Sequence, residues 1–232
     1  MVEFYSGIHS LYPCATAMDK LAIYYAQRAA EYERVYAKLE RQADLAALRT
    51  RIGRLSAGRK VLELACGTGY WTEVMAAGAA LVTAIDVNEQ VLRIARTKSY
   101  PQGRVQIVSG DCYAPPIAGR SHDALFAGFW WSHVPLARLD SFLESILPLI
   151  APGGLIAFLD NRYVTGSSTA IARQDAEGNT YQIRKLEDGS THEVLKNFPT
   201  VSELIQRVSL VGWGANVELF QHYWLLSYWA PK

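Results

Sequence analysis

The sequence of 232 residues contains few cysteines, and its charges are almost balanced. The three cysteines, Cys14, Cys66 and Cys112, are odd in number and lack the spacing of metal ligands. This pattern argues against a disulfide scaffold and a zinc site, and it predicts reduced thiols and no metal. The formal net charge is +1, which gives no electrostatic footprint for nucleic acid or for an anionic membrane.

Long hydrophobic runs are missing as well. No window approaches the length of a membrane span, and the N-terminal residues lack the basic and apolar segments of a signal peptide. We therefore expect a cytoplasmic protein with no membrane partner. Half of the residues are hydrophobic and 19% are charged, which is typical of a globular chain. Its length predicts one domain spanning residues 1–232.

Apolar runs alternate with helical patterns along most of the chain. This alternation is typical of an α/β fold in which helices cover both faces of a doubly wound, Rossmann-like parallel sheet. The expected strands are 60–65, 81–87, 104–109, 123–129 and 154–160. The expected helices are about 71–77, 88–98, 136–150 and 200–210. Residues 217–229 are rich in aromatic and β-branched side chains, which predicts two strands that close the sheet.

Two segments depart from this alternation. Residues 1–55 are predicted to form an N-terminal helical cap, because an amphipathic pattern covers residues 19–55. Residues 161–199 form a polar insert that we expect to be folded and to act as a lid. The turn signal Asp188-Gly189 lies between two strand-like runs of this insert and predicts a β-hairpin.

Residues 61–69, VLELACGTG, carry the strongest functional signal. A buried strand here runs into a turn containing Gly67 and Gly69, and a helix follows. Glycines let the backbone approach a nucleotide-like ligand closely. Asp86 stands at the end of the next strand, where a carboxylate can bind ribose hydroxyls. The turn lacks the third glycine of G-x-G-x-x-G, which argues against an NAD-dependent oxidoreductase.

This segment resembles the first motif, E/D-x-x-x-G-x-G, of the class I S-adenosylmethionine (SAM)-dependent methyltransferases. The resemblance covers about residues 20–160. It implies a seven-stranded sheet, mostly parallel with one antiparallel edge strand. It also implies SAM as cofactor and S-adenosylhomocysteine (SAH) as product. In this family an acidic residue such as Asp86 binds the ribose, one such as Asp111 binds the adenine, and an arginine before the motif, for which Arg41 is our candidate, binds the methionine carboxylate. The cofactor-binding residues that it implies are Tyr24, Tyr32, Arg41, Glu63, Gly67, Gly69, Asp86, Val87, Asp111, Cys112 and Phe129.

The acceptor side is expected after the fourth and fifth strands. His133 is our candidate for a general base, since histidine titrates near neutrality, although a structural histidine fits the position equally well. One of the two adjacent tryptophans before it should belong to the core, because neighbouring side chains point in opposite directions. The predicted substrate-binding residues are Trp131, Asn161, Arg162 and His192.

These features together predict a SAM-dependent methyltransferase that transfers a methyl group to oxygen or nitrogen of a small-molecule acceptor by in-line displacement. The Asn/Asp-Pro-Pro-aromatic motif of enzymes that methylate nucleic-acid bases is missing after the fourth strand, so no nucleic-acid partner is expected. Two alternatives stay open: methylation of RNA or protein, and a SAM-binding subunit or sensor that transfers no methyl group.

Overall fold

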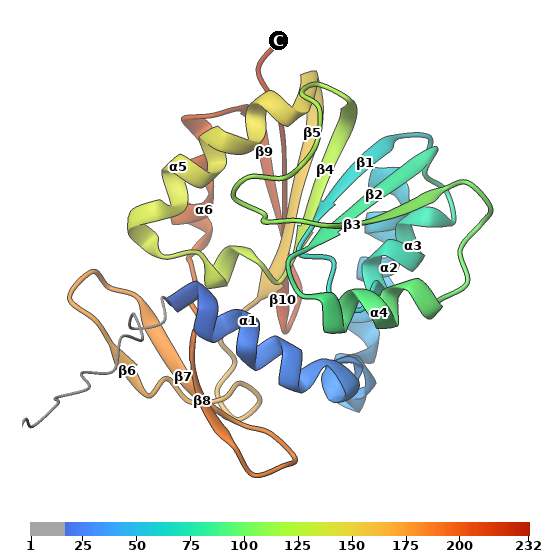
Figure 1. The fold of residues 1–232 in the computed structure, drawn as a ribbon. Coiled ribbons are helices and arrows are strands. Elements are labelled where there is room, and N and C mark those ends of the chain that lie inside the picture. The colour runs from blue at the N-terminus through green and yellow to red at the C-terminus, as the bar shows by residue number, and fades with distance from the viewer. Residues whose placement is uncertain (1–16) are drawn as a thin grey trace, which may run out of the picture.

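The computed structural model describes residues 17–232, with side chains from Lys20 onward; Cys14 lies outside the described residues. Its centre is a seven-stranded sheet (Figure 1). The strands, in chain order, are β1 (Lys60–Leu64), β2 (Leu81–Asp86), β3 (Val105–Ser109), β4 (His122–Gly128), β5 (Ile150–Asn161), β9 (Trp213–Leu219) and β10 (Tyr223–Trp229). Cys66 and Cys112 are buried free thiols.

The strands are arranged in the order β3-β2-β1-β4-β5-β10-β9. The pairs formed among β1 to β5 are all parallel, and β10 pairs antiparallel with both β5 and β9. The predicted seven-stranded, mostly parallel sheet is therefore confirmed, with its antiparallel strand at the β9 end. Because β1 lies between β2 and β4, the chain reverses direction across the sheet at this point, where α/β folds bind ligands.

Helices cover both faces of the sheet. One core lies between the sheet and α1, α5 and α6, and a second lies between the sheet and α2, α3 and α4. Successive residues of β5 alternate between them: Ile156 and Phe158 belong to the first core, whereas Ala157 and Leu159 belong to the second. The helices are α1 (Ala17–Arg28), α2 (Gln42–Ser56), α3 (Tyr70–Ala76), α4 (Glu89–Thr97), α5 (Leu136–Ile146) and α6 (Val201–Ser209).

The N-terminal cap is less regular than the sequence pattern predicts. Two 3₁₀ helices, η1 (Ala29–Ala37) and η2 (Leu39–Arg41), separate α1 from α2. Lys38 between them has extended backbone angles (φ −62°, ψ 123°), which end η1 and redirect the chain. The cap is anchored where the Asn88 side chain donates a hydrogen bond to the carbonyl of Ala22 (2.9 Å).

The insert folds as a small antiparallel sheet of β6 (Arg173–Gln174), β7 (Thr180–Lys185) and β8 (Thr191–Leu195), which we call the accessory sheet. The β7–β8 pair is the predicted hairpin. In Figure 1 the accessory sheet lies beside α1, below the main sheet.

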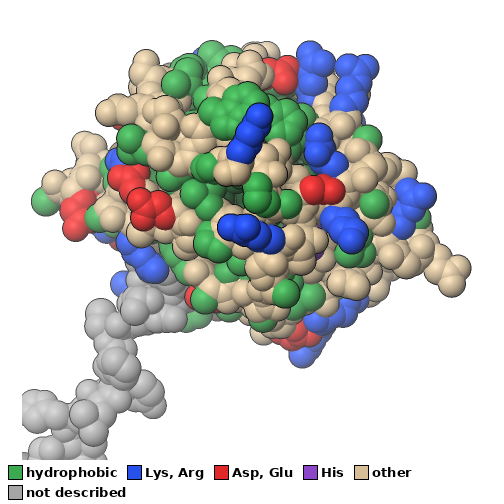
Figure 2. All heavy atoms as spheres, turned by 90° about the horizontal axis from the view of Figure 1, so that it is seen from above, with side chains coloured by type: hydrophobic (Ala, Val, Ile, Leu, Met, Phe, Trp, Pro, Cys, Tyr) green, Lys and Arg blue, Asp and Glu red, His purple; other side chains and the backbone are tan. Residues whose placement is uncertain are grey.

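Figure 2 shows the molecule from above, on the side away from α1 and the accessory sheet, where basic side chains are spread over the surface with a few acidic ones between them. Among residues 17–232, no helix combines the length and the apolar character needed to cross a bilayer. The same residues contain no group of three or more side chains placed to hold a metal ion.

Candidate functional site

Two adjoining cavities lie between the carboxyl ends of the central strands and α1. The first, here called the glycine-turn pocket, is lined by Gly67, Asp86 and Asp111 among others. The second, here called the basic pocket, is lined by side chains from α1, η2 and the accessory sheet. Four residues line both cavities and form their common wall: Tyr25, Tyr32, Phe129 and His133.

The glycine turn is held by a carboxylate at the end of β2. Asp86 accepts hydrogen bonds from the backbone N–H groups of Gly67 and Asn88, both at 2.9 Å. Gly67 has φ +56°, a left-handed conformation that favours glycine. A Cβ at this position would lie 3.8 Å from the ring of Tyr32, so the space beside the turn is open. Burial raises the pKa of Asp86 above its usual range.

The ends of β1 to β4 supply much of the remaining lining of the glycine-turn pocket, and α1, η1 and α4 supply most of the rest. Val87, Asp111 and Cys112, which the resemblance predicts to bind the cofactor, line this pocket. Ala65 (φ 54°) and Phe129 (φ 59°) also line it and have left-handed backbone conformations that are rare outside glycine. Such strain is concentrated at functional sites.

Two predicted cofactor residues lie behind the pocket rather than in its lining. Glu63 is buried and accepts a hydrogen bond from the Thr72 hydroxyl at 2.5 Å. Burial raises its pKa to about 8. Gly69 has φ +81°, and a Cβ there would come within 2.5 Å of the Tyr100 hydroxyl. Both residues shape the turn from outside the cavity.

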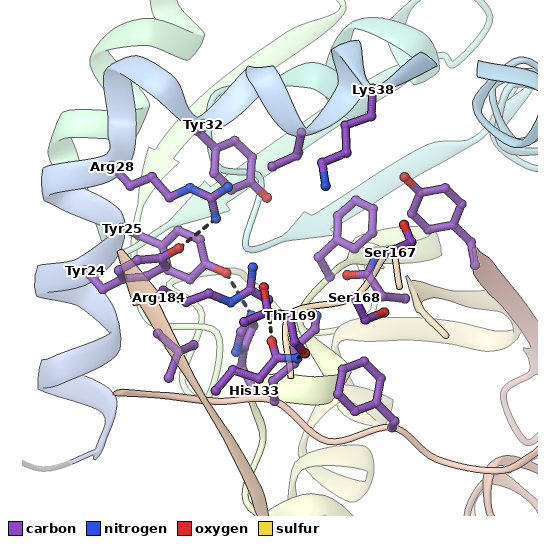
Figure 3. Close-up of a pocket in the computed structure, with 18 of the residues that line it drawn as sticks. Tyr24, Tyr25, Arg28, Tyr32, Lys38, His133, Ser167, Ser168, Thr169 and Arg184 are labelled. Atoms are coloured by element: carbon purple, nitrogen blue, oxygen red, sulfur yellow. Dashed lines mark hydrogen bonds between the residues drawn. The ribbon is translucent and has the colours of Figure 1, made fainter. Parts of the chain in front are cut away.

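The basic pocket collects cations from distant parts of the chain. Figure 3 shows Arg28, Lys38 and Arg184 extending toward one cavity, from α1, from the residue between η1 and η2, and from β7. Arg41 and Lys196 line it too, and none of its lining residues is an aspartate or a glutamate. Ser167, Ser168 and Thr169 add neutral polar groups to the same lining.

Neutral groups hold these guanidinium groups in place. Arg28 donates a hydrogen bond to the Tyr24 hydroxyl (2.8 Å) and lies 5.4 Å from the centre of the Tyr32 ring. Arg41 donates to the Ser167 hydroxyl (3.3 Å) and lies over the ring of Tyr223. The arginines are therefore anchored without losing their net charge to a carboxylate.

His133 is bonded at both ring nitrogens. Its Nδ1 lies 2.6 Å from the carbonyl oxygen of Leu195, so this nitrogen carries the proton and donates. Its Nε2 then accepts from the Tyr25 hydroxyl at 2.8 Å. Burial, assisted by the charge of Lys196, lowers the pKa of His133 to about 3. The imidazole is neutral and engaged, which disfavours the predicted role of general base.

A buried ion pair connects the accessory sheet to the main sheet. The Nζ of Lys196 lies 2.7 Å from Asp160 Oδ1 and 2.7 Å from the Ser132 hydroxyl. Burial opposes ionisation of Asp160, but Lys196, followed by His133, holds the pKa of this carboxyl below its usual range. The pair fixes the end of β8 against the end of β5, next to the common wall.

The other predicted residues are distributed unevenly. Tyr24, Arg41 and Asn161 line the basic pocket, so the first two lie on the side away from the glycine turn. Trp131 lines neither cavity, because it packs in the core with ring centres 5.1 Å from Phe158. The neighbouring Trp130 lines the glycine-turn pocket instead.

Arg162 and His192 also lie outside the lining of both cavities. Arg162 donates a hydrogen bond to the carbonyl of Phe220 (2.5 Å), and His192 packs against the Tyr24 ring. Sequence reasoning missed Tyr25, Lys38 and Arg184, because no local motif marks them.

Comparison with known proteins supports the motif. The profile of a family described as "Methyltransferase domain" matches residues 61–154. The chain is 32% identical over 144 residues to a ubiquinone biosynthesis O-methyltransferase from Thiobacillus denitrificans, which covers 60% of this chain and 58% of that protein. It is 30% identical over 111 residues to a demethylmenaquinone methyltransferase from Staphylococcus aureus, covering 47% and 45%. The chain thus spans about half the length of these curated relatives.

Solved structures match over nearly the whole chain. The DhpI–SAH complex is 30% identical, with a TM-score of 0.72, and the match covers 93% of this chain and 97% of that one. The DhpI–SAM–HEP complex is 28% identical, with a TM-score of 0.75 and coverage of 94% and 99%. The chain belongs to the class I SAM-dependent methyltransferases.

Proposed function

We propose that this methyltransferase binds SAM in the glycine-turn pocket and transfers its methyl group to oxygen or nitrogen of a small molecule in the basic pocket. The observation that carries the proposal is the common wall, because Tyr25, Tyr32, Phe129 and His133 face both cavities. Because the two cavities share these residues, we expect donor and acceptor to meet at this boundary. The basic pocket encloses about 150 Å³ of free space, which suits a small acceptor.

The residues of the glycine-turn pocket fit the cofactor. Asp86 would bind the ribose hydroxyls, Asp111 and Cys112 would adjoin the adenine, and Gly67 leaves room for the backbone to approach the ligand. SAM supplies a methyl group on a sulfonium, which is attracted to aromatic faces such as those of Tyr32 and Phe129. The quinone methyltransferases among the relatives support a small-molecule acceptor.

The protein's own contribution is alignment and exclusion of water. Holding two reactants in a reactive geometry lowers a barrier by about 7–11 kcal/mol. The hydrogen-bonded Tyr25–His133–Leu195 chain fixes the wall between the cavities. We propose His133 as a positioning residue, since its neutral ring holds the Tyr25 hydroxyl. The accessory sheet and α1 cover the acceptor side and keep water out.

Titration calorimetry with SAH, followed by turnover of labelled SAM with a panel of small acceptors, tests this proposal. We expect SAH to bind and the label to appear on a small-molecule product. Transfer only to RNA or protein would favour the first alternative, and binding without transfer to any acceptor would favour a SAM-binding subunit. Failure of the folded protein to bind SAH would contradict the proposal as a whole.

A further inference from the structure

The charges of the basic pocket are not balanced by the protein. Arg28, Lys38, Arg41 and Arg184 line one cavity that has no carboxylate in its lining. None of the four forms an ion pair with any carboxylate of residues 20–232. Converging like charges repel one another, so this arrangement costs free energy until an anion enters.

Two of the guanidinium groups also have unused donors. The Nε atoms of Arg41 and Arg184 are buried and lack a hydrogen-bond partner among the described residues. A buried donor without a partner costs free energy, and an oxygen of a ligand in this pocket would supply the missing acceptor. Burial lowers the pKa of Arg184, and the charges of Arg28 and Arg41 lower it further.

Hydrogen bonds fix the side chains of Arg184 and Arg28 before any ligand binds. The Gln182 side chain, which is fully buried, accepts a hydrogen bond from Arg184 and donates one to the carbonyl of Thr169. Because Arg28 is likewise fixed by the Tyr24 hydroxyl, little side-chain entropy is lost when an anion binds. Planar guanidinium groups match the paired oxygens of carboxylate, phosphate and phosphonate.

The positive lining continues outward. A surface depression shares Arg28, Lys38 and Arg184 with the basic pocket and adds Lys185 and Arg34, the latter paired with Glu187. Glu31 is the acidic residue among the described residues of its lining. This basic depression, which we call the mouth of the basic pocket, raises the local concentration of anions and attracts them toward the pocket.

We propose that the acceptor carries a doubly charged oxyanion, the charge of a phosphonate or phosphate monoester, and that the methyl group is transferred to one of its oxygens. This inference rests on the proposed function. If the carboxylate of the cofactor binds Arg41, then Arg28, Arg184 and Lys38 still face the acceptor. An acceptor with a single negative charge would leave most of the positive charge of these three residues uncompensated.

The proposal also explains why the site needs no base. Burial keeps His133 neutral and, with the neighbouring tyrosines, raises the pKa of Tyr25, so neither residue is suited to remove a proton near neutrality. An oxyanion needs no deprotonation. Its oxygen forms a bond to the methyl carbon, the methyl–sulfur bond breaks, and the electron pair of that bond goes to sulfur. The products are SAH and a methyl ester, and no proton is released.

Calorimetry in saturating SAH tests the inference, with methylphosphonate, methyl phosphate, succinate, acetate and catechol as probes. We expect a dianion to bind and acetate and catechol to bind at least tenfold more weakly. Whether the phosphorus compounds or succinate bind more tightly shows whether the two charges come from one phosphorus group or from two carboxylates. Mass spectrometry should then detect one added methyl group on the acid.

Variants of Arg184 separate recognition from folding. Arg184→Gln should weaken dianion binding about 10- to 100-fold, whereas Arg184→Lys, which retains the charge, should recover part of it. SAH affinity should be unchanged. Because repulsion is relieved, the melting temperature of ligand-free Arg184→Gln should not fall. Arg54→Gln, on the exposed side of α2, is the matched control and should behave as the wild type.

Two results would overturn the inference while leaving the proposed function intact. One is SAH binding together with methylation of catechol and no measurable binding of any anion. The other is acetate binding as tightly as methylphosphonate, which would remove the requirement for two charges. Loss of SAH binding itself would instead contradict the proposed function, so the two failures are distinguishable.

Discussion

At the scale of single residues, Asp86 links the glycine turn to the cofactor. Its two oxygens hold the N–H groups of Gly67 and Asn88, and they lie in the lining where ribose hydroxyls are expected. Asp86→Asn should weaken SAH binding by about 1–3 kcal/mol, because buried donors lose a charged acceptor. Calorimetry measures this change. Asp123→Asn, whose carboxylate accepts from the backbone of Lys60, is the control. Equal affinity in wild type and Asp86→Asn would exclude a direct role in binding.

The low pKa of His133 in the folded protein predicts that the free energy of unfolding depends on pH. Its pKa in the folded protein is about 3, below the ordinary value of 6.5, so between these values the unfolded chain binds more protons. The free energy of unfolding therefore falls as pH decreases, and His133 contributes about 1–2 kcal/mol of loss between pH 7 and pH 5. His133→Asn keeps a donor toward Leu195 without a titrating ring. In urea denaturation this variant should lose less stability over the same interval, and an identical loss would contradict the assignment.

Site residues near the glycine motif could be predicted from the sequence, because strand ends and a glycine turn bring them together locally. Gly67, Asp86 and Asp111 line one pocket for this reason. The basic pocket could be predicted only in part: Tyr24, Arg41 and Asn161 line it, but the sequence did not indicate that they share one cavity. Arg28 and Arg184 come from α1 and β7, and only the docking of the accessory sheet beside α1 brings them together. Periodicity also could not tell which of the two adjacent tryptophans is exposed to a cavity.

At the scale of elements, the buried pair of Lys196 and Asp160 fixes the accessory sheet to the main sheet. Removing one partner leaves an uncompensated buried charge, which costs about 3–5 kcal/mol. Lys196→Ala should therefore lower the free energy of unfolding by this amount, as measured by urea denaturation. Lys185→Ala, an exposed lysine at the end of β7, should change it by less than about 0.5 kcal/mol. Similar stabilities of the two variants would show that the pair adds nothing to this connection.

Most elements of the main sheet follow from the sequence, because its strands are apolar runs bounded by turns. The β7–β8 hairpin was equally readable, since Asp188-Gly189 separates its strands. The cap was predicted less well. Its amphipathic pattern continues through residues 29–41, yet the chain there forms 3₁₀ helices that turn at Lys38. Periodicity reports which side is apolar, but the path over the strand ends is set by tertiary packing.

At the scale of the whole molecule, net charge and local charge differ. The chain carries a formal net charge of +1, so long-range attraction of anions by the molecule as a whole is weak. One continuous depression is nevertheless lined by Arg28, Lys38, Arg184 and Lys185, together with Arg34, which pairs with Glu187. Glu31 is its acidic member among the described residues. An anionic acceptor should therefore be attracted only when it is close to this depression, and added salt should screen that attraction.

This localisation predicts a specific salt dependence. Raising NaCl from about 20 mM to about 300 mM shortens the screening length from about 20 Å to about 6 Å. The kcat/KM for an anionic acceptor should fall several-fold, while kcat and the Kd of SAH change little, because screening weakens capture rather than the aligned complex. Steady-state kinetics across this range measures the slope. Lys185→Gln in the mouth should flatten it, whereas Lys60→Gln, at the start of β1 and the opposite end of the strands, should leave it unchanged. Equal slopes in all three proteins would mean that the mouth does not guide the acceptor, and the pocket's cations would then act only after it has entered.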